Sequence, residues 1–188
     1  NFIPDAMWIE QSMTRLPSGL AVLAAPSIFV PLEAMQPAQI EGLIKTLKSM
    51  FDYVVVDLPR ALVNWIEPVL SDTDQLFIVS DMSVPAVRAT RRLMEFVLAD
   101  NAQLPIEVII NHEKKPMILR EHHREAAKAL DVTFNYWIAH DPKAAREAVD
   151  YGKPLSEVSA RSDIAKGIAS MAKSILTAFP KDGAEVRV

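Results

Sequence analysis

The stretch Tyr53-Val54-Val55-Val56-Asp57 decides the fold that this sequence predicts. Three consecutive valines without polar alternation are typical of a strand that is covered on both faces, as in a parallel sheet. A carboxylate follows directly at the end of the run. Ligands of doubly wound sheets bind beyond the carboxyl ends of the strands, so Asp57 is the first residue to consider for chemistry.

Runs of the same β-rich kind recur along the chain and alternate with helical segments. The expected strands are residues 20–25, 53–57, 75–80, 106–111 and 133–138. Apolar residues recur at helical spacing in residues 36–50, 61–70, 84–99, 118–130, 141–151 and 162–178. Before them we expect a short helix over residues 5–14 and a turn at residues 17–19. The alternation predicts an α/β fold with a doubly wound, mostly parallel sheet and helices on both faces.

Composition limits the classes of protein that remain. The 188 residues are enough for one domain, and half of them are apolar. The formal net charge of −4 argues against binding nucleic acid by bulk electrostatics. There is no cysteine, which excludes disulfides and thiolate metal sites and fits a cytoplasmic location.

Apolar residues followed by an aspartate form the Walker B pattern, in which the carboxylate helps to hold Mg²⁺ beside a nucleotide. Asp57 fits this pattern, although many strands also end in an aspartate that only caps a turn. The companion motif is a glycine-rich loop that wraps phosphates with backbone N–H groups. The chain has five glycines, no two of them within ten residues of each other, so it contains neither a phosphate loop nor a dinucleotide fingerprint.

Residues 51–60, FDYVVVDLPR, resemble the Walker B region of the MinD/ParA superfamily of deviant Walker ATPases. The DLPR ending resembles the CpaE/TadZ branch, the pilus-assembly proteins of the tight-adherence (Tad) system. Residues 20–26, 77–81, 87–93 and 141–155 resemble further segments of that superfamily in the same order. The resemblance covers residues 16–178.

The resemblance implies roles for four residues. Asp57 matches the Walker B aspartate, which would hold Mg²⁺ through water. Asn111 matches the asparagine that contacts the adenine base, and Asp141 and Pro142 match the loop that lines the base pocket. No residue is implied to be catalytic. Without the resemblance, Asn111 would be interpreted as a cap of the following turn.

The deviant phosphate loop of this superfamily, with its signature lysine, matches nothing in the chain. We therefore expect residues 1–180 to be the part of a MinD/ParA-like ATPase domain (P-loop NTPase-like, incomplete) that follows this loop, and residues 181–188 to be a polar tail. The alternative is a homologue that has lost nucleotide binding. We expect no ATP hydrolysis from this chain alone, and slow hydrolysis with ATP and Mg²⁺ as cofactors from an intact protein.

The function that the resemblance implies is that of a localisation factor for Tad (Flp) pilus assembly. In the intact protein, ATP would drive formation of a homodimer that recruits Tad components in the cytoplasm at a cell pole. One alternative is a ParA-like chromosome- or plasmid-partitioning ATPase that acts on DNA. Another is a nucleotide-free scaffold with the same fold.

Other charged and amphipathic features favour ordinary surfaces over special sites. The arginines of residues 88–92 are diluted by acidic neighbours, so we expect a partner surface or a solvated face there, and no DNA binding. The last helix has an apolar stripe that we expect to pack on the sheet, since its polar face is not strongly basic; membrane association is expected only through partners. Four histidines match no usual zinc spacing and are expected to lie on solvated surfaces: His112, His122, His123 and His140.

Overall fold

The computed structural model describes residues 4–25 and 30–181, in two compact units. The first unit comprises residues 1–73 and the second residues 74–188, and each has an apolar core of its own. The last residue of the match at 20–26 and residues 182–188 of the expected tail lie outside the described ranges. Among the helices described, none has the length and apolarity that crossing a bilayer requires.

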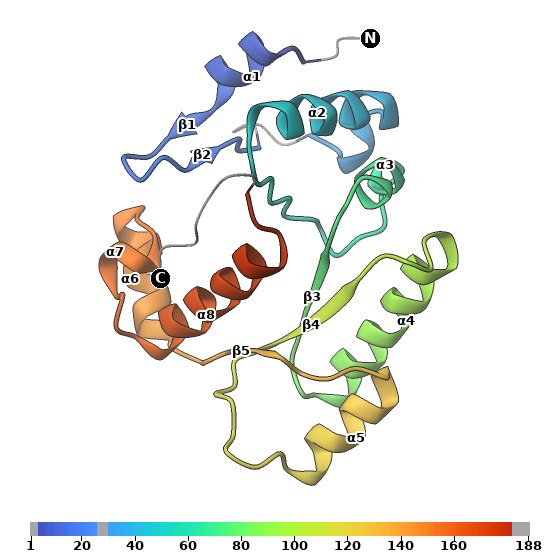
Figure 1. The fold of residues 1–188 in the computed structure, drawn as a ribbon, viewed down its shortest axis with the longest axis vertical. Coiled ribbons are helices and arrows are strands. Elements are labelled where there is room, and N and C mark those ends of the chain that lie inside the picture. The colour runs from blue at the N-terminus through green and yellow to red at the C-terminus, as the bar shows by residue number, and fades with distance from the viewer. Residues whose placement is uncertain (1–3, 26–29, 182–188) are drawn as a thin grey trace. The chain divides into compact units, whose positions relative to one another are not determined.

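The first unit is mainly helical (Figure 1). Its helical elements are α1 (Ala6–Ser12), the 3₁₀ turn η1 (Leu32–Ala34), α2 (Pro37–Met50) and α3 (Ile66–Ser71). Helix α1 begins where the Asp5 side chain accepts a hydrogen bond from the Trp8 N–H at 2.8 Å. The core consists of one side of α2, the segment before α3 and α3 itself: Ile40, Ile44, Val63, Trp65 and Val69.

Two short antiparallel strands precede η1. Strands β1 (Thr14–Arg15) and β2 (Ala21–Val22) pair around a turn in which Gly19 has a φ of 89°, a conformation that favours glycine. The turn expected at residues 17–19 is therefore confirmed. The longer parallel strand expected at residues 20–25 is wrong, because the tight turn brings β2 back onto its neighbour in sequence.

The valine run does not form the expected strand. Residues 53–59 have no regular secondary structure, and 95 % of Val55 is exposed. A strand is stable only when neighbouring backbone groups satisfy its N–H and C=O groups, and no strand within the described ranges pairs with this run. The apolar sequence predicted that these valine side chains are buried on both faces, but the described residues do not cover them in this way.

The second unit contains a three-stranded parallel sheet, as the sequence predicted. Strands β3 (Leu76–Ser80), β4 (Ile106–Asn111) and β5 (Tyr136–Ile138) lie in the order β3-β4-β5. Ile78 lies opposite Val108, and Ile110 lies opposite Trp137. Strand β4 is central and buried, which is why its sequence is almost continuously apolar.

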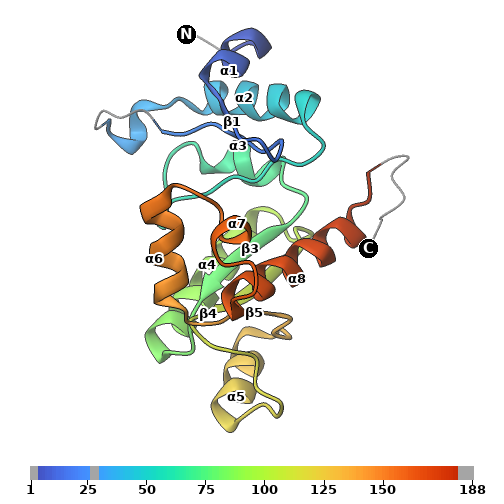
Figure 2. The ribbon, with the colours of Figure 1, turned by 90° about the vertical axis from the view of Figure 1, so that its left-hand side faces the viewer.

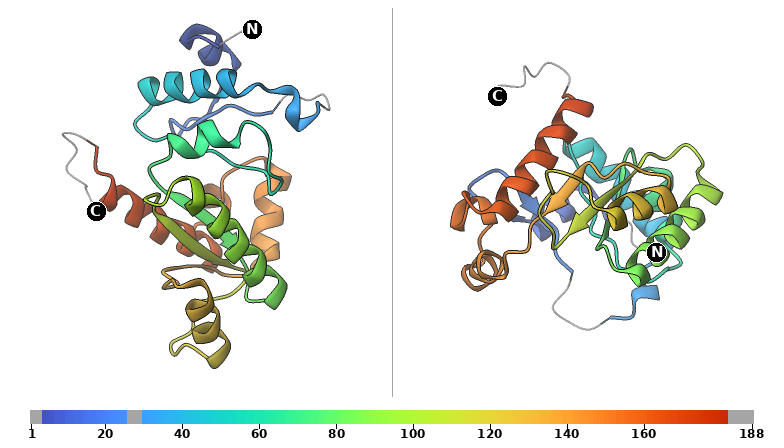
Figure 3. Two further views of the ribbon diagram at one scale, coloured as in Figure 1. Left: turned by 90° about the vertical axis from the view of Figure 1, so that its right-hand side faces the viewer. Right: turned by 90° about the horizontal axis from the view of Figure 1, so that it is seen from below.

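Helices cover both faces of this sheet (Figures 1 and 3). They are α4 (Val84–Asp100), α5 (Glu121–Leu130), α6 (Pro142–Tyr151), α7 (Leu155–Val158) and α8 (Asp163–Ala178). Helices α4 and α5 pack on one face, where Met94, Ala126 and Leu130 meet Val108 and Trp137. Helices α6 and α7 lead to α8, which packs against β5 on the other side (Figure 2).

Helix α8 approaches β5 closely because position 167 is a glycine. A Cβ atom at Gly167 would lie 2.6 Å from the Trp137 carbonyl oxygen. The expected packing of the α8 stripe on the sheet is confirmed only in part: Ile164, Met171 and Ile175 are half-buried, whereas Ile168 and Phe179 are exposed. The arginine-bearing face of α4 is solvated as expected, and Arg91 pairs with Glu95 at 2.8 Å.

Candidate functional site

Polar turns gather at one edge of the parallel sheet. Because β3, β4 and β5 run in the same direction, their carboxyl ends share this edge. The polar residues at or just after these ends are Asp81, Asn111 with His112, and His140 with Asp141. Such an edge is where parallel α/β proteins bind their ligands, so it is the first candidate for a site.

The turn after β3 is fixed by hydrogen bonds. The Asp81 carboxylate accepts a bond from the Ser83 N–H at 2.7 Å, and Ser83 in turn caps α4. Hydrogen bonds from the Ser83 side chain and backbone lower the pKa of Asp81, and a smaller effect in the same direction comes from His112. At the end of β3, Ser80 Oγ accepts a hydrogen bond from the buried Thr90 hydroxyl of α4 at 3.0 Å. The turn therefore presents an ionised carboxylate in a defined position.

The turn after β4 contains a strained residue. His112 has a φ of 63°, in the left-handed region that non-glycine residues rarely adopt. Asn111 supports this conformation, because its Oδ1 accepts the His112 N–H at 3.0 Å. The backbone continues with the Glu113 N–H donating to the Ile138 carbonyl at 3.1 Å, which extends the pairing of β4 and β5. Strain of this kind clusters at functional sites.

The turn after β5 lies beside the turn after β4. The rings of His112 and His140 meet edge to face with centroids 5.3 Å apart. Asp141 caps α6 by accepting the Ala144 N–H at 3.0 Å, and Pro142 occupies the first turn of the helix. The cap that the Asp-Pro pair predicted is therefore present.

The structure brings together three of the four site residues that the sequence proposed. Asn111, Asp141 and Pro142 lie on neighbouring turns at one sheet edge. Asp57 belongs to the first unit, is exposed and follows no strand. His140 precedes Asp141 at the end of an expected strand, but the contact of its ring with His112 was not foreseen. A short polar run directly after each apolar run was the only sequence signal for these two histidines.

A buried histidine organises the loop that leads from β4 to α5. His123 is fully buried, so the expectation of a solvated surface is wrong for this residue. Its Nδ1 accepts the Arg120 N–H at 3.1 Å, and its Nε2 lies 2.8 Å from Glu113 Oε1. Because a backbone N–H only donates, the ring proton is on Nε2 and faces the carboxylate. The edge of the ring packs on Trp137, with centroids 5.3 Å apart.

Glu113, His122 and His123 have potential metal-ligand atoms within 4.8 Å of one another. The hydrogen bonds argue against a metal ion there. Binding through Nε2 of a neutral imidazole requires the proton on Nδ1, which would leave the Arg120 N–H without its acceptor. The arrangement therefore fits a structural clamp.

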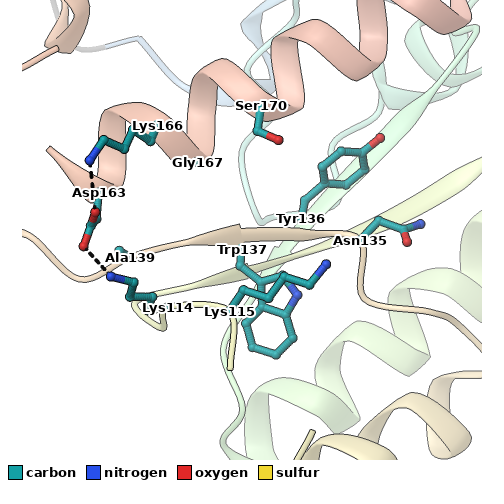
Figure 4. A pocket seen from close by; sticks show the side chains of 10 residues that line it. All are labelled: Lys114, Lys115, Asn135, Tyr136, Trp137, Ala139, Asp163, Lys166, Gly167 and Ser170. Atoms are coloured by element: carbon teal, nitrogen blue, oxygen red, sulfur yellow. Dashed lines mark hydrogen bonds and ion pairs between the residues drawn. The ribbon is translucent and has the colours of Figure 1, made fainter. Parts of the chain in front are cut away.

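A cavity of about 330 Å³ opens between α8, β5 and the start of the β4–α5 loop (Figure 4). Three lysines, Lys114, Lys115 and Lys166, and the acidic residue Asp163 are among the residues that line it. Asp163 pairs with Lys114 at 2.9 Å and with Lys166 at 3.6 Å, and these cations lower its pKa. The four side chains together carry a net positive charge.

No protein-family model matches the sequence. The septum site-determining protein MinD of Bacillus subtilis (strain 168) is 24 % identical over 99 residues, an alignment that spans 53 % of this chain and 35 % of that protein. Among solved structures, a ParA family ATPase from Chlorobium tepidum TLS superposes with a TM-score of 0.79 and 22 % identity over 90 % of this chain and 70 % of that one. The chain has the fold of the MinD and ParA ATPases.

A second similar structure is the complex of the cell division proteins MinC and MinD from Aquifex aeolicus. Its TM-score is 0.71 at 17 % identity, over 99 % of this chain and 76 % of that chain. The MinD/ParA fold is therefore established, as the resemblance of residues 51–60 led us to expect. At these identities the likeness establishes the fold alone, and any function of the sheet edge depends on the residues that form it.

Proposed function

We propose that this chain is the base-recognising part of an ATP-dependent switch of the MinD/ParA kind. The observation that carries the proposal is the sheet edge at which the Asn111–His112 turn adjoins the His140–Asp141 turn. An asparagine amide offers one donor and one acceptor, the pair that an adenine edge requires. Asn111 is half-buried, and within the described residues its Nδ2 makes a single long contact of 3.4 Å, with His112 Nε2.

In this proposal Asp141 and Pro142 shape the wall of the base pocket, and Asp57 holds Mg²⁺ through water. The sequence lacks a glycine-rich phosphate loop, so the proposal assigns phosphate binding to a segment outside these 188 residues. Residues 1–180 are then part of one ATPase domain that acts in the cytoplasm. ATP binding drives homodimerisation, and hydrolysis is slow and resets the switch.

We further propose that the switch serves Tad pilus assembly, in the manner of CpaE/TadZ proteins placed at a cell pole. The DLPR sequence that ends at residue 60 supports this branch over a partitioning ATPase. The net charge of −4 and the ion pair of Arg91 with Glu95 also weigh against a DNA-binding surface.

Asn111→Leu in the intact protein tests base recognition. Loss of the amide should reduce the preference for ATP over GTP by about tenfold, because a base-edge hydrogen bond is lost. Asn135→Leu is the matched control, since Asn135 is an exposed asparagine whose amide nitrogen donates to the Glu107 carboxylate. Equilibrium dialysis with both nucleotides measures the preference. An unchanged preference in Asn111→Leu would remove Asn111 from the site.

Asp57→Ala tests the magnesium role separately. The variant should bind ATP with little dependence on Mg²⁺ and should no longer dimerise with Mg-ATP, which light scattering measures. If Mg-ATP binding and dimerisation are unchanged, the role given to Asp57 is wrong. If the intact wild-type protein binds no ATP at all, the chain belongs to a nucleotide-free scaffold.

A further inference from the structure

Among the described residues of the second unit, the most exposed large apolar side chains lie on one loop. We call residues 114–119, between β4 and α5, the docking loop. Met117 is 104 % exposed and Ile118 is 80 % exposed, and Leu119 next to them is partly exposed. Adjacent apolar side chains that protrude to this extent mark interaction sites more often than single exposed residues do. The helix expected from residue 118 begins only at Glu121, which leaves these side chains outside it.

The docking loop is held in place at both ends. The His123 ring bonds Glu113 before the loop and the Arg120 N–H after it. Arg124 adds a bond from its guanidinium to the Leu119 carbonyl at 2.8 Å. The buried ring therefore ties together the two ends of the loop, between which Met117 and Ile118 are exposed.

The docking loop itself carries only cations, whereas Glu113 and Glu121 stand on either side of it and Asp163 of α8 pairs with Lys114 and Lys166. Residues 114–120 carry three cations, Lys114, Lys115 and Arg120, and no acidic residue. Lys115 is unpaired within the described part of the chain and lines the cavity with Lys166 (Figure 4). A cationic cavity thus adjoins a protruding apolar tip, since Lys115 is only two residues before Met117.

We propose that the docking loop binds an anionic lipid surface. Met117 and Ile118 enter the interfacial layer, and Lys115 and Lys166 contact headgroup phosphates. A convex apolar tip needs no preformed pocket in a bilayer, whereas a protein partner would have to supply one. Apolar insertion combined with electrostatic attraction is the usual basis of such binding. This inference goes beyond the proposed function, since lipid binding by the loop requires no nucleotide. It also differs from the sequence-based expectation that membrane association occurs only through partners, because that expectation considered only helix α8.

Co-sedimentation of the 188-residue chain with vesicles tests the inference. Vesicles of phosphatidylcholine mixed with phosphatidylglycerol should bind the chain at low salt, and vesicles of phosphatidylcholine alone should bind it much more weakly. The double variant Met117→Ser/Ile118→Ser should bind roughly tenfold more weakly, and Lys115→Glu should lose a similar factor. Val149→Ser, at a 79 % exposed position on α6, and Lys128→Glu on α5 are the matched controls and should bind like the wild type.

Several results would overturn the proposal. One is the absence of binding to the anionic vesicles, and another is equal binding by the Met117/Ile118 double variant. Inorganic phosphate at constant ionic strength should not release the protein; release would show that the cavity binds free phosphate and not a lipid surface. Sedimentation velocity completes the test, because self-association that disappears in the double variant would make the loop a contact between two copies. Thermal unfolding should be unchanged in this variant, since neither side chain is buried.

Discussion

Replacing His123 with leucine should remove the clamp on the β4–α5 loop while keeping a side chain of similar size against Trp137. Two hydrogen bonds are lost: one to the Glu113 carboxylate at 2.8 Å and one from the Arg120 N–H at 3.1 Å. A bond to a charged group contributes about 1.5–3 kcal/mol and a neutral one about 0.5–1.5 kcal/mol. The Glu113 side chain is 32 % exposed and regains water, so we expect a net loss of about 2–3 kcal/mol in the free energy of unfolding.

Urea titration followed by circular dichroism measures this loss, and amide hydrogen exchange locates it. Exchange of the Arg120 N–H should accelerate more than that of the amides in β4. His122→Leu is the matched control, because His122 is the exposed neighbour of His123, and its free energy of unfolding should change by less than about 0.5 kcal/mol. If His123→Leu changes as little as this control, or leaves exchange at Arg120 unaltered, the clamp does not hold the loop.

Three further predictions concern single positions in the second unit. Gly167→Ala should lower the free energy of unfolding by about 1–3 kcal/mol in urea titration, because its Cβ would lie 2.6 Å from the Trp137 carbonyl oxygen; wild-type stability would show that α8 shifts without cost. His112→Val should cost about 1–2 kcal/mol, whereas His112→Gly should stay within about 0.5 kcal/mol of the wild type, since only glycine accepts a φ of 63° without strain; equal values for both variants would contradict this. The pKa of Asp81 is lowered from 3.8 in the folded state by its Ser83 hydrogen bonds, so these bonds stabilise the fold above that pH and their contribution is lost as the pH falls. In a pH series of unfolding titrations, Asp81→Asn should therefore make the free energy of unfolding fall less steeply at acid pH, by less than about 0.5 kcal/mol because the group is solvated. A steeper fall would show that the pKa of Asp81 is not lowered in the folded state.

Local patterns were sufficient where the interactions that stabilise an element lie close in sequence. The bounds expected for β4 are those observed, and the helix expected at residues 141–151 matches α6 to within one residue, because the Asp141 cap and Pro142 act on adjacent backbone groups. The hairpin turn at Gly19 followed in the same way from its turn residues. The site residues Asn111 and Asp141 could also be located, since each stands at the end of an apolar run.

The sequence alone determined the α/β class, the parallel sheet and the polar sheet edge, because apolar periodicity and caps are local properties. Only the tertiary structure decided which elements have partners. The run at residues 53–57 has strong strand character, but no strand in the described part of the chain pairs with it, and β2 pairs with β1 because the turn holds them together. His123 is likewise a buried clamp and not a solvated residue. Its role depends on contacts of its imidazole ring with Glu113, Arg120 and Trp137, which only the folded chain brings together.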